Sequence, residues 1–205
     1  MKIKICGITN MDDAQNAVSL GADAIGFIFS KNSPRYVSPE VAEGISLFLP
    51  PFVFVVGVFV DEDKETVKEI SERCKLDLIQ LHGEESPAYC LEMPRRVIKA
   101  FRVSEPEDLE PITLYQGVVS AILLDTRVKD IEGGTGRTFD WGLALKAKEH
   151  DIPLILAGGI TSDNIEKAVQ LVNPYAVDLS SGVESEPGRK DYNKMAEILE
   201  IARGL

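Results

Sequence analysis

The sequence has 205 residues, 44% of them hydrophobic, so it is long enough to bury one substantial core and we expect a single domain over residues 1–205. A formal net charge of −11, from 33 acidic and 22 basic side chains, repels a phosphate backbone and argues against nucleic acid as a partner. With no signal peptide and no apolar run of membrane length, we expect a cytoplasmic protein without a membrane partner.

Short runs rich in Val, Ile, Leu and Phe recur along the chain, and each has the length of a buried strand. They predict strands near residues 2–6, 24–29, 52–60, 78–81, 96–101, 121–125, 154–157 and 176–179. Amphipathic stretches of helical length lie between them, for example at 11–20, 63–74, 164–172 and 192–203. Ser38 before Pro39 predicts a helix start, and Ser162 or Asp163 is expected to cap a later helix. This alternation is typical of a parallel α/β sheet.

Strand–helix units of this kind can close into a (β/α)8 barrel or lie open as a doubly wound sheet, and periodicity does not distinguish the two. The length of the chain favours the single-domain α/β TIM barrel, which is the fold we expect. In such a barrel the carboxyl ends of the strands converge on the face that carries the active site. The residues predicted at or just after those ends are Cys6, Arg35, Asp61, His82, Asp125, Gly158, Gly159, Ser180, Ser181 and Gly182.

Glycine-containing turns follow the last two predicted strands, one at residues 157–160 and one at residues 178–183. Glycine lets backbone N–H groups approach an anion, and the loops after strands 7 and 8 of these barrels often bind phosphate. Tight turns that bind nothing would also use glycine. Because two such turns occur at equivalent positions, we predict a site for a phosphorylated small molecule. Its candidate residues are Gly158, Gly159, Asp178, Ser180, Ser181 and Gly182.

Reactive side chains end two of the predicted strands. Cys6 is either an inert packing residue or a base whose pKa is modestly lowered by neighbouring cations or dipoles. Asp125 follows an apolar run, where a carboxylate has no packing purpose, and is either a loop-capping group or a proton donor in a partly desolvated cleft. We predict that Cys6 and Asp125 form a catalytic acid–base pair. Cys74 and Cys90 fall in predicted helices as packing residues, and the cysteine spacing predicts no disulfide framework or metal site.

Arg35 and Arg137 lie in predicted loops, the second beside the glycine-rich stretch 133–136. Each is either an ordinary surface arginine or a fork for a substrate carboxylate. His82 follows the fourth predicted strand, and His150 ends a helix without a partner motif. Two histidines without metal-ligand spacing do not predict a metal site. We therefore take Arg35, His82 and Arg137 as candidate substrate-binding residues.

Several motifs occur in a fixed order along nearly the whole chain. They are Lys4-Ile5-Cys6-Gly7-Ile8-Thr9, Ser33-Pro34-Arg35-Tyr36, Gln80-Leu81-His82-Gly83, Leu124-Asp125-Thr126, Gly133-Gly134-Thr135-Gly136, Phe139-Asp140-Trp141 and Asp178-Leu179-Ser180-Ser181-Gly182-Val183-Glu184. The first and last are specific rather than generic. Together the motifs closely resemble the phosphoribosylanthranilate isomerase family, and no functional position departs from its pattern.

The resemblance implies an isomerase of tryptophan biosynthesis. The reaction would be the Amadori rearrangement of N-(5'-phosphoribosyl)anthranilate to 1-(2-carboxyphenylamino)-1-deoxyribulose 5-phosphate. The resemblance assigns Asp125 as the general acid that protonates the furanose oxygen and Cys6 as the general base that removes the proton from C2. Arg35 would bind the anthranilate carboxylate, and the two glycine turns would bind the phosphate. The resemblance implies no metal, nucleotide or redox cofactor.

Other functions share some of these features. A metal-dependent pentose-phosphate epimerase would use similar phosphate turns but needs histidines that this chain lacks. Indole-glycerol-phosphate synthase would need an extra amino-terminal segment and a catalytic lysine at a strand end. A sugar-phosphate-binding module without turnover would keep the turns but has no use for Cys6 and Asp125 together.

The segment 47–54 is apolar throughout and contains two prolines, although it joins a helix to a strand at the amino-terminal face of the predicted barrel. A stiff apolar loop loses little entropy on docking, so it can anchor a symmetric homodimer that leaves both active sites open. The alternative is that Phe52 and Phe54 close the barrel floor as core residues. Exposure of the segment decides between the two.

Overall fold

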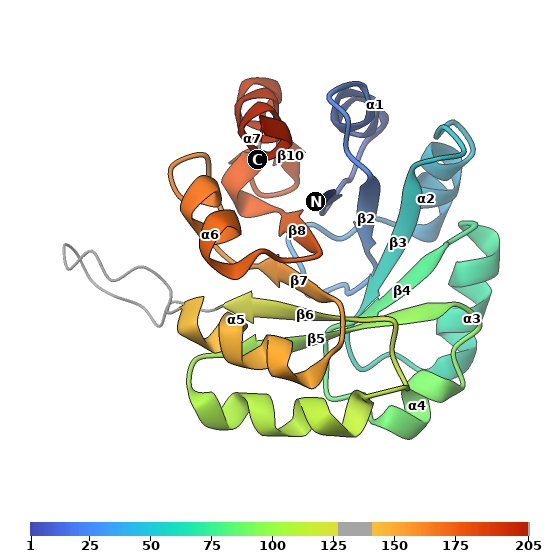
Figure 1. Cartoon of the computed structure of the whole chain (residues 1–205). Helices are drawn as coiled ribbons and strands as arrows, with labels where there is room; N and C mark the ends of the chain where they lie inside the picture. The colour runs from blue at the N-terminus through green and yellow to red at the C-terminus, as the bar shows by residue number, and fades with distance from the viewer. Residues whose placement is uncertain (127–140, 205) are drawn as a thin grey trace.

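The computed structural model describes residues 1–126 and 141–204, and within these residues eight parallel strands form a closed barrel (Figure 1). Each strand pairs with the next in sequence, and β8 pairs with β1 to close the ring. The strands are β1 Lys2–Cys6, β2 Ala24–Ile28, β3 Phe54–Phe59, β4 Leu78–Leu81, β5 Arg96–Val103, β6 Ala121–Thr126, β7 Leu154–Ala157 and β8 Ala176–Leu179. The predicted TIM barrel is therefore confirmed, and the open doubly wound sheet is wrong.

Helices lie on the outside of the barrel between the strands (Figure 1). The α-helices are α1 Met11–Ser19, α2 Pro39–Ser46, α3 Lys64–Arg73, α4 Pro87–Leu91, α5 Trp141–Ala147, α6 Ile165–Val172 and α7 Tyr192–Gly204. The 3-10 helices are η1 Pro106–Tyr115, η2 Lys148–His150 and η3 Ser181–Val183, and a short antiparallel hairpin pairs β9 Glu184–Glu186 with β10 Arg189–Lys190. Among the described residues, no helix combines the length and hydropathy that a membrane span requires.

Local capping chemistry sets the helix starts. The Ser38 side chain accepts a hydrogen bond from Val41 N at the start of α2, as predicted. The prediction that Ser162 or Asp163 caps α6 is wrong, because Asn164 occupies the N-cap position. The Asn164 side chain turns back instead, accepting from Thr161 N at 2.9 Å and donating to Gly159 O at 2.9 Å. It therefore braces the loop between β7 and α6 rather than the helix.

The core has an inner and an outer part. Small and branched side chains fill the barrel interior, among them Val56, Ala100 and Leu123. A larger apolar cluster lies between the strands and the helices. Cys74 and Cys90 belong to this outer cluster, as predicted, and burial raises the pKa of each thiol to about 11.

The two ends of the chain meet on one carboxylate. Lys2 Nζ lies 2.8 Å from Asp23 Oδ1, and Arg203 Nη2 lies 3.4 Å from Asp23 Oδ2. Arg203 also donates to the carbonyl oxygen of Gly21. Because α7 packs beside α1, these contacts join the first and last elements of the ring.

The apolar segment 47–54 precedes β3, which begins at Phe54 rather than at the predicted residue 52. Phe52 is 94% exposed and Phe48 is 75% exposed, and Leu47 is also exposed. The interpretation of Phe52 and Phe54 as the barrel floor is therefore wrong, since even Phe54 is 43% exposed. A large apolar surface remains at the amino-terminal face.

Candidate active site

A cavity of about 820 Å³ lies at the carboxyl ends of the strands. Every candidate site residue that the structure describes lines it. These residues are Cys6, Arg35, His82, Asp125, Gly158, Gly159, Asp178, Ser180, Ser181 and Gly182. Arg137 and the glycine-rich stretch 133–136 lie outside the described residues. Asp61, also predicted near a strand end, does not line the cavity, and its carboxylate accepts a hydrogen bond from Glu84 N at 2.6 Å.

Cys6 is the last residue of β1 and is almost fully buried beside Gly26 of β2. A Cβ atom on Gly26 would come within 2.9 Å of the Cys6 sulfur, so only glycine leaves room for the thiol. Burial raises the pKa of Cys6 and Asp178 adds to this, while Lys4 and Lys190 oppose them. The expected cations are present, but burial and the carboxylate outweigh their lowering effect on the Cys6 pKa.

Lys4 is a buried cation that the sequence analysis did not single out. It points to the same side of β1 as Cys6, because side chains two residues apart share a face of a strand. Its Nζ donates to Asp178 Oδ2 at 2.9 Å and to Gln80 Oε1 at 2.8 Å. Burial disfavours the ammonium, but Asp178 outweighs it and raises the pKa of Lys4. The sequence signal that could have identified this contact is Lys4 itself, a charged residue inside the apolar predicted strand 2–6.

Asp178 lies on β8, and only one of its oxygens is used within the described chain. The other, Oδ1, is buried without a hydrogen-bond partner among the described residues. Because Asp178 lines the cavity, this oxygen can accept a hydrogen bond from a ligand hydroxyl.

Asp125 lies on β6 beside His82, the residue that follows β4. His82 Nε2 is 3.2 Å from Asp125 Oδ2, at ion-pair distance but outside hydrogen-bond geometry. Gln80 must turn its Oε1 to Lys4, which can only donate, so its amide nitrogen faces His82 Nδ1 at 3.4 Å. In a neutral ring, Nδ1 would therefore accept from Gln80 and the proton would lie on Nε2, facing Asp125.

The two glycine turns have backbones that other residues would strain. Gly158 and Gly159 have φ of +83° and +65°, in the left-handed region that favours glycine. A Cβ atom on Gly182 would clash with the carbonyl oxygen of Ile160, so the turn after β8 packs directly on the turn after β7. The two turns therefore form one continuous backbone wall of the cavity.

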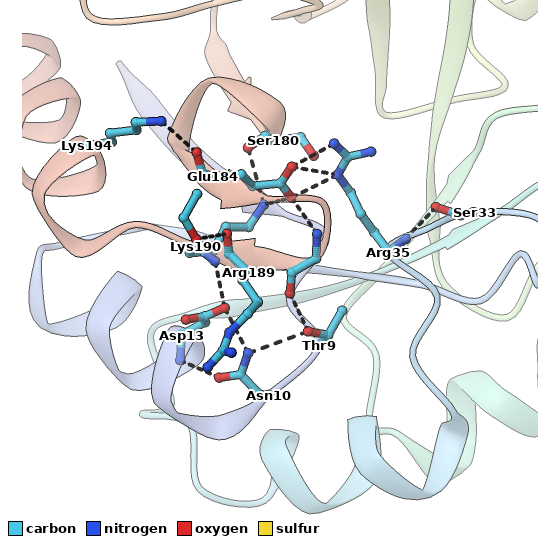
Figure 2. A network of polar contacts seen from close by, with 12 residues as sticks. Thr9, Asn10, Asp13, Ser33, Arg35, Ser180, Glu184, Arg189, Lys190 and Lys194 are labelled. Carbon is cyan, nitrogen blue, oxygen red and sulfur yellow. Dashed lines mark hydrogen bonds and ion pairs between the residues drawn. The ribbon is translucent and has the colours of Figure 1, made fainter.

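Arg35 is held by Glu184, the first residue of β9, as Figure 2 shows. Its Nε donates to Glu184 Oε1 at 2.8 Å, and its Nη2 donates to Glu184 Oε2 at 2.6 Å. The Glu184 carboxylate raises the pKa of Arg35. Glu184 is itself bound by Lys190, and hydrogen bonds from the two cations hold its pKa below its usual range in spite of burial.

Glu184 closes the last sequence motif, but the sequence analysis gave it no role. Lys190 was not singled out, because the β9–β10 hairpin that carries it is too short to show a periodic pattern. Among the described residues there is no group of three or more His, Cys, Asp or Glu side chains that could hold a metal ion.

This barrel places a thiol, a carboxylate, an arginine and a glycine-lined wall around one cavity. It defines the class of (β/α)8-barrel enzymes with an anion-binding, acid–base site at the carboxyl ends of the strands.

The family model for N-(5'-phosphoribosyl)anthranilate (PRA) isomerase matches residues 3–201. The N-(5'-phosphoribosyl)anthranilate isomerase of Geobacter metallireducens is 54% identical over 203 residues, which cover 99% of each chain. The crystal structure of the Thermotoga maritima enzyme has a TM-score of 0.93 at 45% identity, with 100% of each chain covered. A phosphoribosyl anthranilate isomerase complex with reduced 1-(o-carboxyphenylamino)-1-deoxyribulose 5-phosphate has a TM-score of 0.91 at 43% identity, also with full coverage. The chain belongs to the N-(5'-phosphoribosyl)anthranilate isomerase family.

Proposed function

We propose that this chain converts N-(5'-phosphoribosyl)anthranilate to 1-(2-carboxyphenylamino)-1-deoxyribulose 5-phosphate, with Asp125 as the general acid and Cys6 as the general base. Family membership makes it an isomerase of tryptophan biosynthesis. The observation that carries the residue assignment is that Cys6 on β1 and Asp125 on β6 line the same cavity as the glycine wall. A phosphorylated sugar bound to that wall would present its ring to both groups.

The proton transfers balance within one substrate. Asp125 donates a proton to the furanose oxygen, the bond from that oxygen to C1 breaks, and the nitrogen lone pair forms a Schiff base. The cationic Schiff base acidifies the proton on C2, and the Cys6 thiolate removes it to give an enolamine. Tautomerisation of the enolamine then gives the ketose, so the reaction is a net isomerisation with no external oxidant or reductant.

Binding groups are proposed for each end of the substrate. Gly158, Gly159, Ser180, Ser181 and Gly182 would surround the phosphate with backbone and hydroxyl donors. Arg35 would bind the anthranilate carboxylate with the guanidinium edge that Glu184 leaves open.

Two further polar residues, Asp178 and His82, line the cavity. Asp178 Oδ1 would accept from a sugar hydroxyl. His82 would contact the substrate next to Asp125. Arg137 remains a candidate for the same cavity from sequence alone.

We also propose a homodimer formed through the amino-terminal faces of two barrels. The exposure of Phe48 and Phe52 supports an interface, because exposed apolar patches of this kind mark contact surfaces. One similar structure, 41% identical to this chain, is of monomers generated from the dimeric Thermotoga maritima enzyme. A second copy of this chain would bury the segment 47–54 and leave both cavities open.

The proposed reaction is tested with purified protein and freshly made N-(5'-phosphoribosyl)anthranilate. Disappearance of the anthranilate adduct is followed by fluorescence, and the product is identified by mass and by its ketone. Turnover that is saturable and first order in enzyme is expected. No turnover above the spontaneous rate would contradict the proposal.

A further inference from the structure

Lys190 is a buried ammonium group that the proposed mechanism does not use. It lies on β10, its side chain is 0% exposed, and it does not line the cavity. Its Nζ donates to Glu184 Oε1 at 2.9 Å and to Ser180 O at 3.3 Å (Figure 2). Its backbone N–H is fixed by Asp13 Oδ2 at 2.8 Å. Burying an ammonium group costs free energy of desolvation, and packing alone does not explain why a lysine occupies this position.

Glu184 stands between Lys190 and Arg35 and is nearly as buried, at 4% exposure. It binds the Nε and Nη2 atoms of Arg35, which form one edge of the guanidinium. Arg35 Nη1 donates no hydrogen bond to another of the described residues. The end of the guanidinium therefore stays available for a second, ligand carboxylate, in an orientation that Glu184 fixes.

The charges along this row decide what the Arg35 site attracts. Arg35 and Glu184 alone are a neutral pair, and the Glu184 carboxylate would repel an incoming carboxylate. Lys190 adds a second cation behind Glu184, so the row of three side chains carries one net positive charge. The Lys190 and Glu184 side chains are almost fully buried, so the added charge is weakly screened by solvent.

We infer that Lys190 is a positioning residue that sets the specificity of the Arg35 site for a substrate carboxylate. It neutralises Glu184, so that Glu184 can orient Arg35 without cancelling the attraction of Arg35 for the carboxylate. Lys190 also holds the carbonyl oxygen of Ser180, which joins the carboxylate end of the cavity to the turn proposed for the phosphate. This inference rests on the proposed function, and it adds a determinant of specificity outside the cavity.

The test compares two ligands that differ only in the carboxylate. One is reduced 1-(o-carboxyphenylamino)-1-deoxyribulose 5-phosphate, and the other is the same molecule with phenylamino in place of carboxyphenylamino. Titration calorimetry gives a Kd for each ligand. The carboxylate selectivity is the Kd of the ligand without the carboxylate divided by the Kd of the ligand with it. Lys190→Met should lower this ratio by about tenfold, mainly by weakening the carboxylate ligand, because one nearby positive charge is lost.

Two variants separate charge from folding. Arg189→Met removes the same charge from the neighbouring residue, whose side chain is exposed and does not touch Glu184, and should leave the selectivity within twofold of wild type. The double variant Glu184→Gln with Lys190→Met restores one net positive charge. Its carboxylate selectivity should therefore be at least threefold higher than that of Lys190→Met alone. If Lys190 served only as structural support, the carboxylate selectivity of the double variant would be lower than that of Lys190→Met alone.

The outcomes are distinct. An unchanged ratio in Lys190→Met, or an equal fall in Arg189→Met, would overturn the inference. Failure of the double variant to exceed the single variant would overturn it as well, provided that circular dichroism shows both folded. If wild type binds neither ligand, the proposed function itself fails. If wild type binds both equally, the Arg35 assignment fails, and the role of Lys190 with it.

Discussion

The Cys6 thiol is almost fully buried and lies near a carboxylate and two ammonium groups. Burial and Asp178 raise its pKa, so the site favours the thiol over the thiolate. A thiol is alkylated by iodoacetamide as its thiolate, so we expect the alkylation rate of Cys6 to rise with pH through the Cys6 pKa, above the ordinary thiol value of about 8.5. The pH dependence of alkylation measures this, with Cys6→Ala as the blank, and a midpoint below pH 8 would show that the two ammonium groups outweigh burial and Asp178.

Removal of either proposed proton-transfer group should slow turnover strongly without unfolding the barrel. Cys6→Ala and Asp125→Asn should each lower kcat by roughly 10²-fold or more, the usual loss for a general acid or base. Cys74→Ala is the matched control, since Cys74 is buried in the outer core away from the cavity and should change kcat by less than about twofold. Near-normal turnover in either active-site variant would refute that residue's role.

The sequence predicted which residues line the cavity but not how they are paired. Strand ends and glycine turns identify Cys6 and Asp125 as members of one face, because the barrel itself brings them together. The partners Lys4, Gln80 and Glu184 are set by side-chain contacts across 76 to 174 residues of sequence, which no local pattern encodes. The net direction of the Cys6 pKa shift could not be predicted for the same reason, because burial is a tertiary property.

At the level of elements, the turns after β7 and β8 depend on each other. Gly182→Ala would push a methyl group against the Ile160 carbonyl, so the two turns must separate. We expect roughly tenfold weaker binding of the phosphorylated substrate, seen as a higher KM, together with a stability loss of about 1–3 kcal/mol.

Gly44→Ala is the matched control for this substitution. Gly44 lies inside α2, and an added Cβ there meets nothing within 4 Å. The change should leave KM as in wild type and raise stability by up to about 1 kcal/mol, because alanine is the better helix former. If Gly182→Ala binds substrate as tightly as Gly44→Ala, the contact between the turns does not shape the phosphate site.

The strands were predicted to within two residues at each end because parallel barrel strands are continuous apolar runs bounded by turns. The helical layer was less visible. The link from β5 to β6 is a 3-10 helix that contains Pro106 and Pro111, and its side chains lack an α-helical period. The β9–β10 hairpin has only three and two residues in its strands, so its pattern is too short to read.

At the scale of the whole molecule, the exposed segment 47–54 should control assembly. Phe52→Glu places a charge at the most exposed aromatic side chain of this surface, so it should convert the homodimer into a monomer. Tyr192→Glu is the control, because Tyr192 is also exposed but begins α7, the helix that follows the carboxyl end of β8. Sedimentation equilibrium measures both, and a wild type that stays monomeric at high micromolar concentration would eliminate the dimer.

Residues near both ends of the chain contact Asp23, so the barrel should tolerate circular permutation, in which the chain starts at a different strand–helix unit of the same ring. Lys2 and Arg203 bind the same carboxylate, so a short glycine linker could join the ends with little loop-closure entropy. New ends could then be opened in a surface turn at the amino-terminal face, far from the cavity. A circularly permuted gene of this kind should encode the same barrel and the same active site, with β1 no longer the first strand to leave the ribosome.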